Sequence, residues 1–256
     1  MGTDWIKETD FAHRGLHGLS EGCPENSLAA IEQAAQHGYG VEIDVQRTAD
    51  YEAVVFHDAN LNRMTNRHGP VSNWESSKLR ETRLAESSER IPTLRQVLDL
   101  VNGRAPLLIE IKSSPGPVVP GVLEQRVATL LESYSGPVGV MSLSPNPLAW
   151  LGLLSPHTPL GNVVSKVHRT KYLKGFLRGA AKVVRRIGAG AIAKSDFVAV
   201  DLNIIEQLQP DVIRQKGKPV LTWTVTSEAD AADARQHADA LIFEGFRPSG
   251  VKPRGE

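Results

Sequence analysis

Short apolar runs rich in Val and Ile alternate with longer amphipathic runs along the whole chain. The short runs are typical of buried strands, and the longer runs have helical spacing and capping residues at their ends. The expected strands are residues 11–13, 40–46, 53–57, 107–112, 137–143, 160–164, 197–202, 219–225 and 240–243. The expected helices are residues 27–37, 93–102, 121–134, 147–154, 171–187, 211–216 and 228–237.

This alternation of strands and helices is typical of a parallel sheet with helical crossovers. A chain of 256 residues favours a closed α/β barrel of the (β/α)₈ TIM type over an open doubly wound sheet, because such a barrel typically takes ~250 residues. No Gly-x-Gly-x-x-Gly pattern follows the first strand, which disfavours a dinucleotide-binding fold. We expect a single domain over residues 1–256, with a polar, loop-rich insertion at residues 58–90 after the second strand region.

Composition narrows the class of protein. The chain is 41% hydrophobic and 23% charged, and its 29 basic and 29 acidic residues give no net charge, which disfavours a dedicated nucleic-acid-binding protein. No apolar run approaches the ~20 residues of a membrane span, and the first residues lack the apolar core of a signal peptide. The single cysteine, Cys23, cannot form an internal disulfide. We therefore expect a cytoplasmic enzyme, with its oligomeric state left open.

Charged side chains recur in the expected strands, near the ends where barrel active sites lie. Glu42 and Asp44 are two positions apart and therefore share one face of their strand, and Glu110 and Lys112 share a face in the same way. Three carboxylates that meet at one opening repel one another unless a cation lies between them. Oxygen ligands suit Mg²⁺ or Ca²⁺ rather than zinc, so the pattern predicts one divalent cation held by Glu42, Asp44 and Glu110.

Two histidines are expected beside these carboxylates. A hairpin centred near Ala49 and Asp50 would place His57 opposite Glu42, and His13 would enter from the neighbouring strand. Cationic side chains can hold a phosphate, a metal can offset developing charge, and two imidazoles can accept and donate a proton. Such a set is typical of an enzyme that cleaves phosphodiesters.

Six motifs follow one another in order between residues 11 and 112. They are His13-Arg14-Gly15, Pro24-Glu25-Asn26-Ser27, Glu42-x-Asp44-Val45, His57-Asp58-x-x-Leu61-x-Arg63-x-Thr65, Ile91-Pro92-Thr93-Leu94 and Glu110-Ile111-Lys112, with weaker echoes at Ser142 and Trp223-Thr224. In this order they resemble the motifs of the glycerophosphodiester phosphodiesterases. The resemblance implies a TIM-type barrel, a divalent metal, and hydrolysis of a glycerophosphodiester to glycerol 3-phosphate and an alcohol. By the same resemblance, the metal ligands are Glu42, Asp44 and Glu110, the acid–base pair is His13 and His57, and the phosphate-binding residues are Arg14 and Lys112.

Other residues near these motifs have two interpretations each. Glu25 is either an acid at a helix N-terminus or a partner of Arg14, and Asp58 either orients His57 or caps the following loop. Trp223 late in its strand favours an apolar wall for the leaving group over core packing.

Three positions depart from the pattern that the family usually shows. Leu143 stands where an aromatic residue is common, Thr226 where Asn is usual, and Phe243-Glu244 where Thr-Asp often ends the last strand. We expect these positions near the leaving alcohol, so they bear on its identity rather than on the phosphate chemistry.

A basic segment leaves room for other functions. Residues 162–195 contain no acidic side chain, and the expected helix at 171–187 has a cationic polar face. This face is either simply solvated or makes peripheral contact with anionic lipid through residues 166–194. The second interpretation would make the enzyme a phospholipase D-like hydrolase of lysophospholipids or phospholipids. A non-catalytic barrel that binds phosphorylated metabolites is a further alternative, whereas a zinc hydrolase is disfavoured because no His-x-His follows the first strand.

Overall fold

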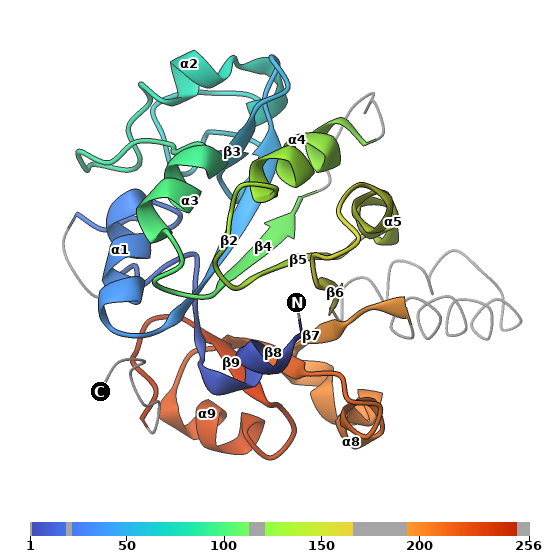
Figure 1. The fold of residues 1–256 in the computed structure, drawn as a ribbon. Coiled ribbons are helices and arrows are strands. Elements are labelled where there is room, and N and C mark those ends of the chain that lie inside the picture. Colours follow the sequence, from blue (N-terminus) through green and yellow to red (C-terminus); the bar gives the residue numbers. More distant parts are fainter. Residues whose placement is uncertain (1, 19–21, 113–120, 166–193, 250–256) are drawn as a thin grey trace, which may run out of the picture.

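A closed barrel of parallel strands forms the centre of the molecule (Figure 1). The computed structural model describes residues 2–18, 22–112, 121–165 and 194–249. Within these residues the barrel strands are β1 (Phe11–His13), β2 (Gly40–Arg47), β4 (Leu107–Ile111), β5 (Val138–Ser142), β6 (Leu160–Val164), β7 (Phe197–Asp201), β8 (Val220–Val225) and β9 (Ala240–Phe243). Strand β1 pairs in parallel with both β2 and β9 and so closes the barrel, which confirms the predicted fold class.

Helices lie around the barrel between successive strands (Figure 1). They are α1 (Leu28–Gln36), α3 (Leu94–Val101), α4 (Val122–Leu131), α5 (Pro145–Leu154), α8 (Pro210–Arg214) and α9 (Glu228–Ala234), with short 3₁₀ turns η1 (Asp4–Glu8) and η3 (Leu202–Leu208). Their first residues follow local capping: Ser27 accepts a hydrogen bond from the backbone of Ala30, and Thr93 forms a capping box with Gln96. The expected helix at 171–187, and most of the basic segment, lie outside the described residues.

Strand β3 (Ala53–Val55) is antiparallel to β2 and extends the sheet outside the barrel. The observed pairs include Arg47 with Ala53 and Val45 with Val55, so the hairpin is centred on residue 50. The predicted register, with His57 opposite Glu42, is therefore wrong by one residue. The reason is the turn at residues 48–52, in which the backbone and side chain of Thr48 bond to Glu52.

The region that follows β3 has few regular elements and a small apolar cluster of its own. It contains η2 (Val71–Asn73) and α2 (Ser76–Leu79). Beneath them lie fully or almost fully buried side chains, namely Val54, Phe56, Leu61, Val71, Leu79, Leu84 and Ile91. This packing holds the segment from residue 58 to residue 90 against the side of the barrel that carries β2.

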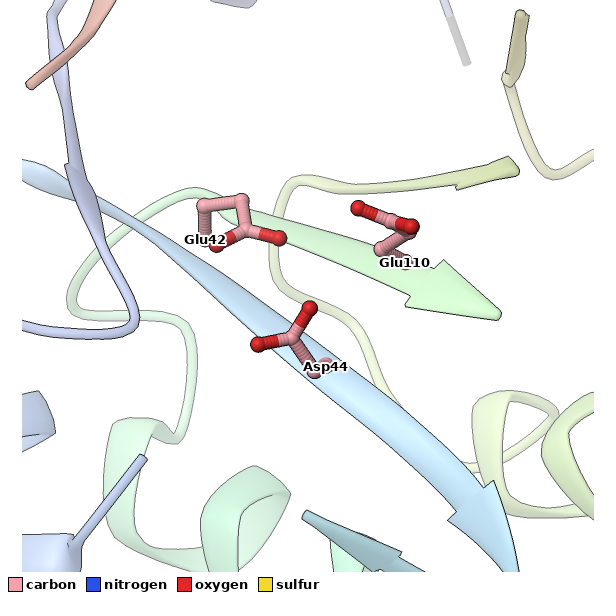
Figure 2. A group of neighbouring side chains, drawn as sticks. All are labelled: Glu42, Asp44 and Glu110. Atoms are coloured by element: carbon pink, nitrogen blue, oxygen red, sulfur yellow. The ribbon is translucent and has the colours of Figure 1, made fainter. Parts of the chain in front are cut away.

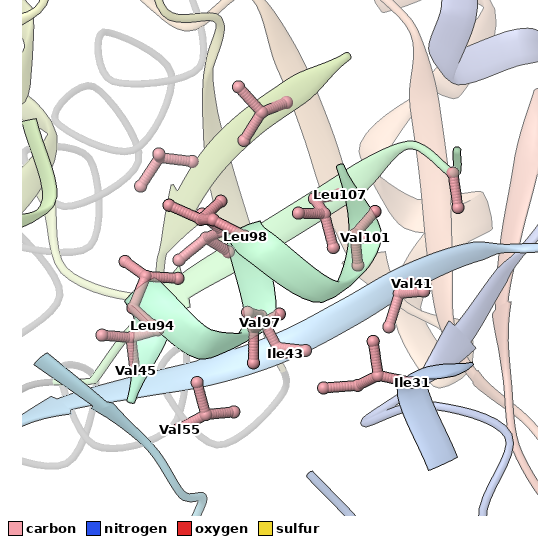
Figure 3. Close-up of a cluster of buried hydrophobic side chains, with 14 of the residues drawn as sticks. Ile31, Val41, Ile43, Val45, Val55, Leu94, Val97, Leu98, Val101 and Leu107 are labelled. Atoms are coloured by element: carbon pink, nitrogen blue, oxygen red, sulfur yellow. The ribbon is translucent and has the colours of Figure 1, made fainter. Parts of the chain in front are cut away.

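The alternation of side chains along the strands separates the core from the site. Ile43 points outward and packs with the helices α1 and α3 (Figure 3), and Ile109 belongs to the same apolar cluster. Glu42, Asp44 and Glu110 occupy the opposite, inward face. Below these acids, the inside of the barrel is filled by a second apolar cluster that includes Phe11, Leu108, Met141, Phe197 and Ile242. Among the described residues, the three acids thus lie at one end of this apolar filling. Within the described residues, no helix has the length and apolar character needed to cross a bilayer.

Candidate active site

Three carboxylates meet at the end of the barrel where the strands finish. Asp44 on β2 lies directly beside Glu110 on β4 in the sheet register, and Glu42 precedes Asp44 on the same face. One ligand oxygen from each of the three lies within 4.8 Å of the others, and Figure 2 shows the side chains pointing toward one another. All three are buried, and Asp44 is 0% exposed. The structure thus brings together the acids that the sequence predicted as a cluster.

Burial and mutual repulsion decide the charge of this cluster. Burial raises the pKa of Glu42, and the nearby carboxylates of Asp44 and Glu110 raise it further. Burial also raises the pKa of Glu110. Burial alone would raise the pKa of Asp44 as well, but the ammonium of Lys112 holds it well below its usual range, since Lys112 Nζ lies 2.8 Å from Asp44 Oδ1 and 2.8 Å from Glu110 Oε1.

The donor set fits a hard divalent cation. It consists of carboxylate oxygens on two adjacent rigid strands, which is the ligand chemistry of Mg²⁺ and Ca²⁺. A buried carboxylate with a raised pKa is one whose negative charge lacks full compensation. Among the described residues, this is the one group of three or more acidic, histidine or cysteine side chains close enough to share an ion. Glu42, Asp44 and Glu110 could therefore hold a metal ion.

We expect protons to compete with the metal at this cluster. Glu42 and Glu110 have pKa values above their usual range, so ionising them costs folding stability as pH rises above their unfolded values of ~4.3. A bound cation removes that cost. Saturating Mg²⁺ or Ca²⁺ should therefore raise the melting temperature more at pH 7.5 than at pH 5.5, as measured by calorimetry.

The matched variant for this measurement is Glu42→Gln, which removes the carboxylate with the most strongly raised pKa. Its melting temperature should respond less to the cation and should depend less on pH. An equal melting-temperature rise at both pH values in the wild-type protein would contradict the assignment of the metal to these acids.

His13 stands at the end of β1 with its two ring nitrogens in different surroundings. Its Nδ1 lies 2.6 Å from Oε2 of Glu244, and its Nε2 lies 3.9 Å from Oε2 of Glu42. The His13 bond holds the pKa of Glu244 down to about 2. The ring is therefore tied on one side to a carboxylate and faces the acidic cluster with the other.

Arg14 follows His13 in a left-handed backbone conformation with φ of 58°. This conformation lets its backbone N–H donate to Oε2 of Glu42, at 3.2 Å. Its guanidinium group lies 3.4 Å from Asp44 Oδ2 and donates to Glu25 Oε1 at 3.0 Å. Glu25 precedes the N-cap residue of α1, Ser27, so the structure supports its role as a partner of Arg14 rather than as a helix acid.

His57 is half-buried in the loop after β3. Its Nδ1 lies 2.7 Å from Asp58 Oδ1, and Asp58 in turn accepts two hydrogen bonds from Arg63, at 2.6 and 3.0 Å. Burial lowers the pKa of His57, while Asp44 and Asp58 act in the opposite direction. Of the two roles open to Asp58 from the sequence, the contact with His57 is the one that the structure displays.

Arg63, for which the sequence predicted no role, connects the residues around His57 with those around Arg14. Besides its bonds to Asp58, it donates to Glu25 at 2.6 and 2.9 Å. Glu25 also holds Arg14, so one guanidinium group joins the partner of His57 to the partner of Arg14. The sequence offered one signal for this link, the position of Arg63 within the motif that begins at His57.

One cavity of about 110 Å³ gathers most of the predicted residues. Its polar side is lined by His13, Arg14, Glu42, His57, Glu110 and Lys112, and its apolar side by Met141, Leu143, Val163, Trp223 and Ile242. Leu143 and Trp223, both predicted to contact the leaving alcohol, thus line the apolar side of this cavity. Of the other positions expected near the leaving alcohol, Glu244 contacts His13 through its carboxylate, and Thr226 donates to Asp230.

Comparison with known proteins identifies the family to which the chain belongs. Residues 13–244 match the model of the "Glycerophosphoryl diester phosphodiesterase family". A glycerophosphodiester phosphodiesterase of Bacillus altitudinis is 35% identical over 264 residues, which cover 96% of this chain and 98% of that protein.

Solved structures show the same barrel. A phosphodiesterase of Oleispira antarctica, in complex with the product sn-glycerol-3-phosphate, has a TM-score of 0.75 at 23% identity and covers 92% of each chain. A glycerophosphodiester phosphodiesterase of Thermotoga maritima has a TM-score of 0.70 at 21% identity and covers 92% of this chain and 94% of its own. Because the family model spans nearly the whole barrel and a relative is similar over almost its entire length, the chain belongs to the glycerophosphoryl diester phosphodiesterase family and is a phosphoric diester hydrolase.

Proposed function

We propose that this enzyme cleaves glycerophosphodiesters to glycerol 3-phosphate and an alcohol, with one divalent cation, Mg²⁺ or Ca²⁺, held by Glu42, Asp44 and Glu110. The observation that carries the proposal is the meeting of two imidazoles, two cationic side chains and two carboxylates around one cavity. The third carboxylate, Asp44, lies buried beside the other two. The family membership supports the reaction class. The sn-glycerol-3-phosphate found in the Oleispira antarctica structure supports the product.

Arg14 and Lys112 are assigned to the phosphate. Both line the cavity beside the acidic cluster, and each presents N–H donors that suit phosphate oxygens. Lys112 already contacts Asp44 and Glu110, so its charge is held beside the proposed metal ligands at the wall of the cavity. A divalent cation bound here supplies further compensation as negative charge develops on the phosphate oxygens.

His13 and His57 are assigned as the acid–base pair. We assign His13 as the general base that takes a proton from the nucleophile as its oxygen bonds to phosphorus. His57 is the general acid that gives a proton to the alcohol oxygen as the old P–O bond breaks. The reverse assignment uses the same atoms and is tested below. The nucleophile is either water or the glycerol hydroxyl of the substrate, and the latter gives a cyclic phosphate that water then opens.

The apolar side of the cavity is assigned to the leaving alcohol. Trp223 is partly buried, and its Nε1 donates to the backbone of Ala199 at 3.4 Å, so that its ring is fixed at the wall of the cavity. Leu143 lines the same wall. An alcohol with an apolar portion gains contact area there, which keeps lysophospholipids on the list of substrates to be tested. Contact with a membrane through residues 166–194 stays a prediction, because residues 166–193 lie outside the described residues.

A substrate panel tests the proposal. Glycerophosphocholine, glycerophosphoethanolamine, lysophosphatidylcholine and phosphatidylcholine vesicles are each incubated with Mg²⁺, Ca²⁺ or EDTA, and the products are identified by ³¹P NMR. We expect glycerol 3-phosphate from the soluble diesters and its loss in EDTA. A cyclic phosphate signal would identify the internal nucleophile. Absence of turnover on all soluble glycerophosphodiesters, with release of lysophosphatidic acid from lysophosphatidylcholine, would replace this proposal by the phospholipase D-like activity.

A further inference from the structure

Glu244 lies at this site but has no part in metal binding, acid–base catalysis or phosphate binding as proposed above. It directly follows β9, and the sequence suggested that it lies near the leaving alcohol. In the structure its carboxylate lies between two imidazoles. Oε2 is 2.6 Å from Nδ1 of His13, and Oε1 is 3.7 Å from Nε2 of His17.

The backbone places this carboxylate with little freedom. Strand β9 pairs with β1 so that Ala12 lies beside Phe243, and continuing this register sets His13 beside Glu244. The backbone N–H of Glu244 donates to the carbonyl of Val225, at 2.9 Å. Glu244 is thus anchored to the two strands next to the point where the barrel closes, rather than carried by a free loop.

The contact determines which nitrogen of His13 carries a proton. An ionised carboxylate only accepts hydrogen bonds, so the short contact requires an N–H at Nδ1. A neutral imidazole has one N–H, and its other nitrogen, Nε2, then has a free lone pair. Nε2 is the nitrogen that faces Glu42, at 3.9 Å, and therefore the one directed at the cavity.

We propose that Glu244 is a positioning residue for His13, which orients the ring and keeps the proton on Nδ1 so that Nε2 exchanges protons with the substrate. The inference rests on the proposed acid–base role of His13. The other imidazole offers a parallel, because Nδ1 of His57 lies 2.7 Å from Asp58. Both rings are thus tied to a carboxylate through Nδ1, and Asp58 is in turn held by Arg63.

The variant Glu244→Gln tests this role because it keeps the shape of the side chain. An amide can donate to Nδ1 as well as accept from it, and so permits the wrong tautomer; the comparable Asp→Asn change in serine proteases is strongly damaging for this reason. We expect kcat on glycerophosphocholine to fall about 100-fold or more. KM and the Mg²⁺ affinity should stay close to those of the wild type. ¹⁵N NMR of the His13 ring should show loss of the single Nδ1–H tautomer.

A double-mutant cycle shows whether Glu244 acts through His13. In a His13→Gln background, the added change Glu244→Gln should alter kcat little, because the ring that it positions is already gone. The control is Glu206→Gln, which removes a carboxylate 3.7 Å from His237, beside a different cavity, and should leave kcat unchanged. Glu244→Ala provides a second variant with the same expected loss, should the Gln variant fail to give a cooperative melt.

The outcomes distinguish a failure of the positioning role of Glu244 from a failure of the acid–base role of His13. Wild-type kcat in both Glu244 variants, or the same fold-loss from Glu244→Gln with and without His13, would overturn the positioning role and leave the proposed function intact. Full activity of His13→Gln alone would instead overturn the acid–base assignment on which the inference rests.

Discussion

Replacing Asp44 by Asn is expected to lower kcat by about 10³-fold or more and to remove the stimulation of activity by Mg²⁺ or Ca²⁺. Asp44 is fully buried, and its two oxygens contact Lys112 at 2.8 Å and Arg14 at 3.4 Å. The change therefore removes a proposed metal ligand and also takes one anionic partner from each of the two cationic side chains assigned to the phosphate. Steady-state kinetics with and without EDTA, together with calorimetric titration of the cation, measure the effect.

Loss of stability must be separated from loss of the metal site in this variant. Removing one partner of a buried ion pair can cost about 3–5 kcal/mol, so unfolding is followed by denaturant titration in the same preparation. Asp99→Asn is the matched control, since Asp99 is exposed on α3 and only loosely paired with Arg95, at 3.8 Å. A folded Asp44→Asn protein that binds the cation with wild-type affinity and keeps its turnover would contradict the proposed site.

Replacing His57 by Ala is expected to lower kcat about 10²–10⁴-fold, with cation binding retained. The ring lines the cavity but does not belong to the acidic cluster that is proposed to hold the cation. If His57 is the general acid, the loss should be much smaller on a glycerophosphodiester of p-nitrophenol, because that leaving group departs without taking a proton. The variant His13→Ala should lose the same factor in kcat on both substrates, because the general base acts on the nucleophile and not on the leaving group.

The contrast between the two substrates decides the assignment of the acid and the base. If His13→Ala recovers on the p-nitrophenyl ester and His57→Ala does not, the two roles are exchanged. His237→Ala serves as the control, since that ring lies beside a different cavity. Near wild-type turnover of His57→Ala on every phosphodiester tried would show that this imidazole is not part of the acid–base pair.

The barrel and its acidic cluster could be predicted because both follow from local rules. A period of two along β2 places Glu42 and Asp44 on one face and Ile43 on the other, whichever strand lies next to them. The rule that barrel sites lie at the carboxyl ends of strands then brings Glu110 to the same opening. The structure agrees at each of these positions.

The features that could not be predicted depend on side-chain contacts and on exact register. The hairpin after β2 is shifted by one residue because Thr48 bonds to Glu52 across the turn, and no pattern of apolar residues encodes that bond. The contact of Glu244 with His13 requires the pairing of β9 with β1, and Arg63 reaches Glu25 only after the loop that carries it has packed against the barrel.

The seam between β1 and β9 has a consequence for how the enzyme matures. His13 and Glu244 are 231 positions apart in the chain, and contacts of such long range carry a high entropic cost and depend on most of the fold being present. A chain still emerging from the ribosome holds its proposed metal ligands and His57 long before it can complete this pair. Among the described strands β9 comes last in the chain, so the contact between Glu244 and His13 can form only once this strand has been made and has paired with β1.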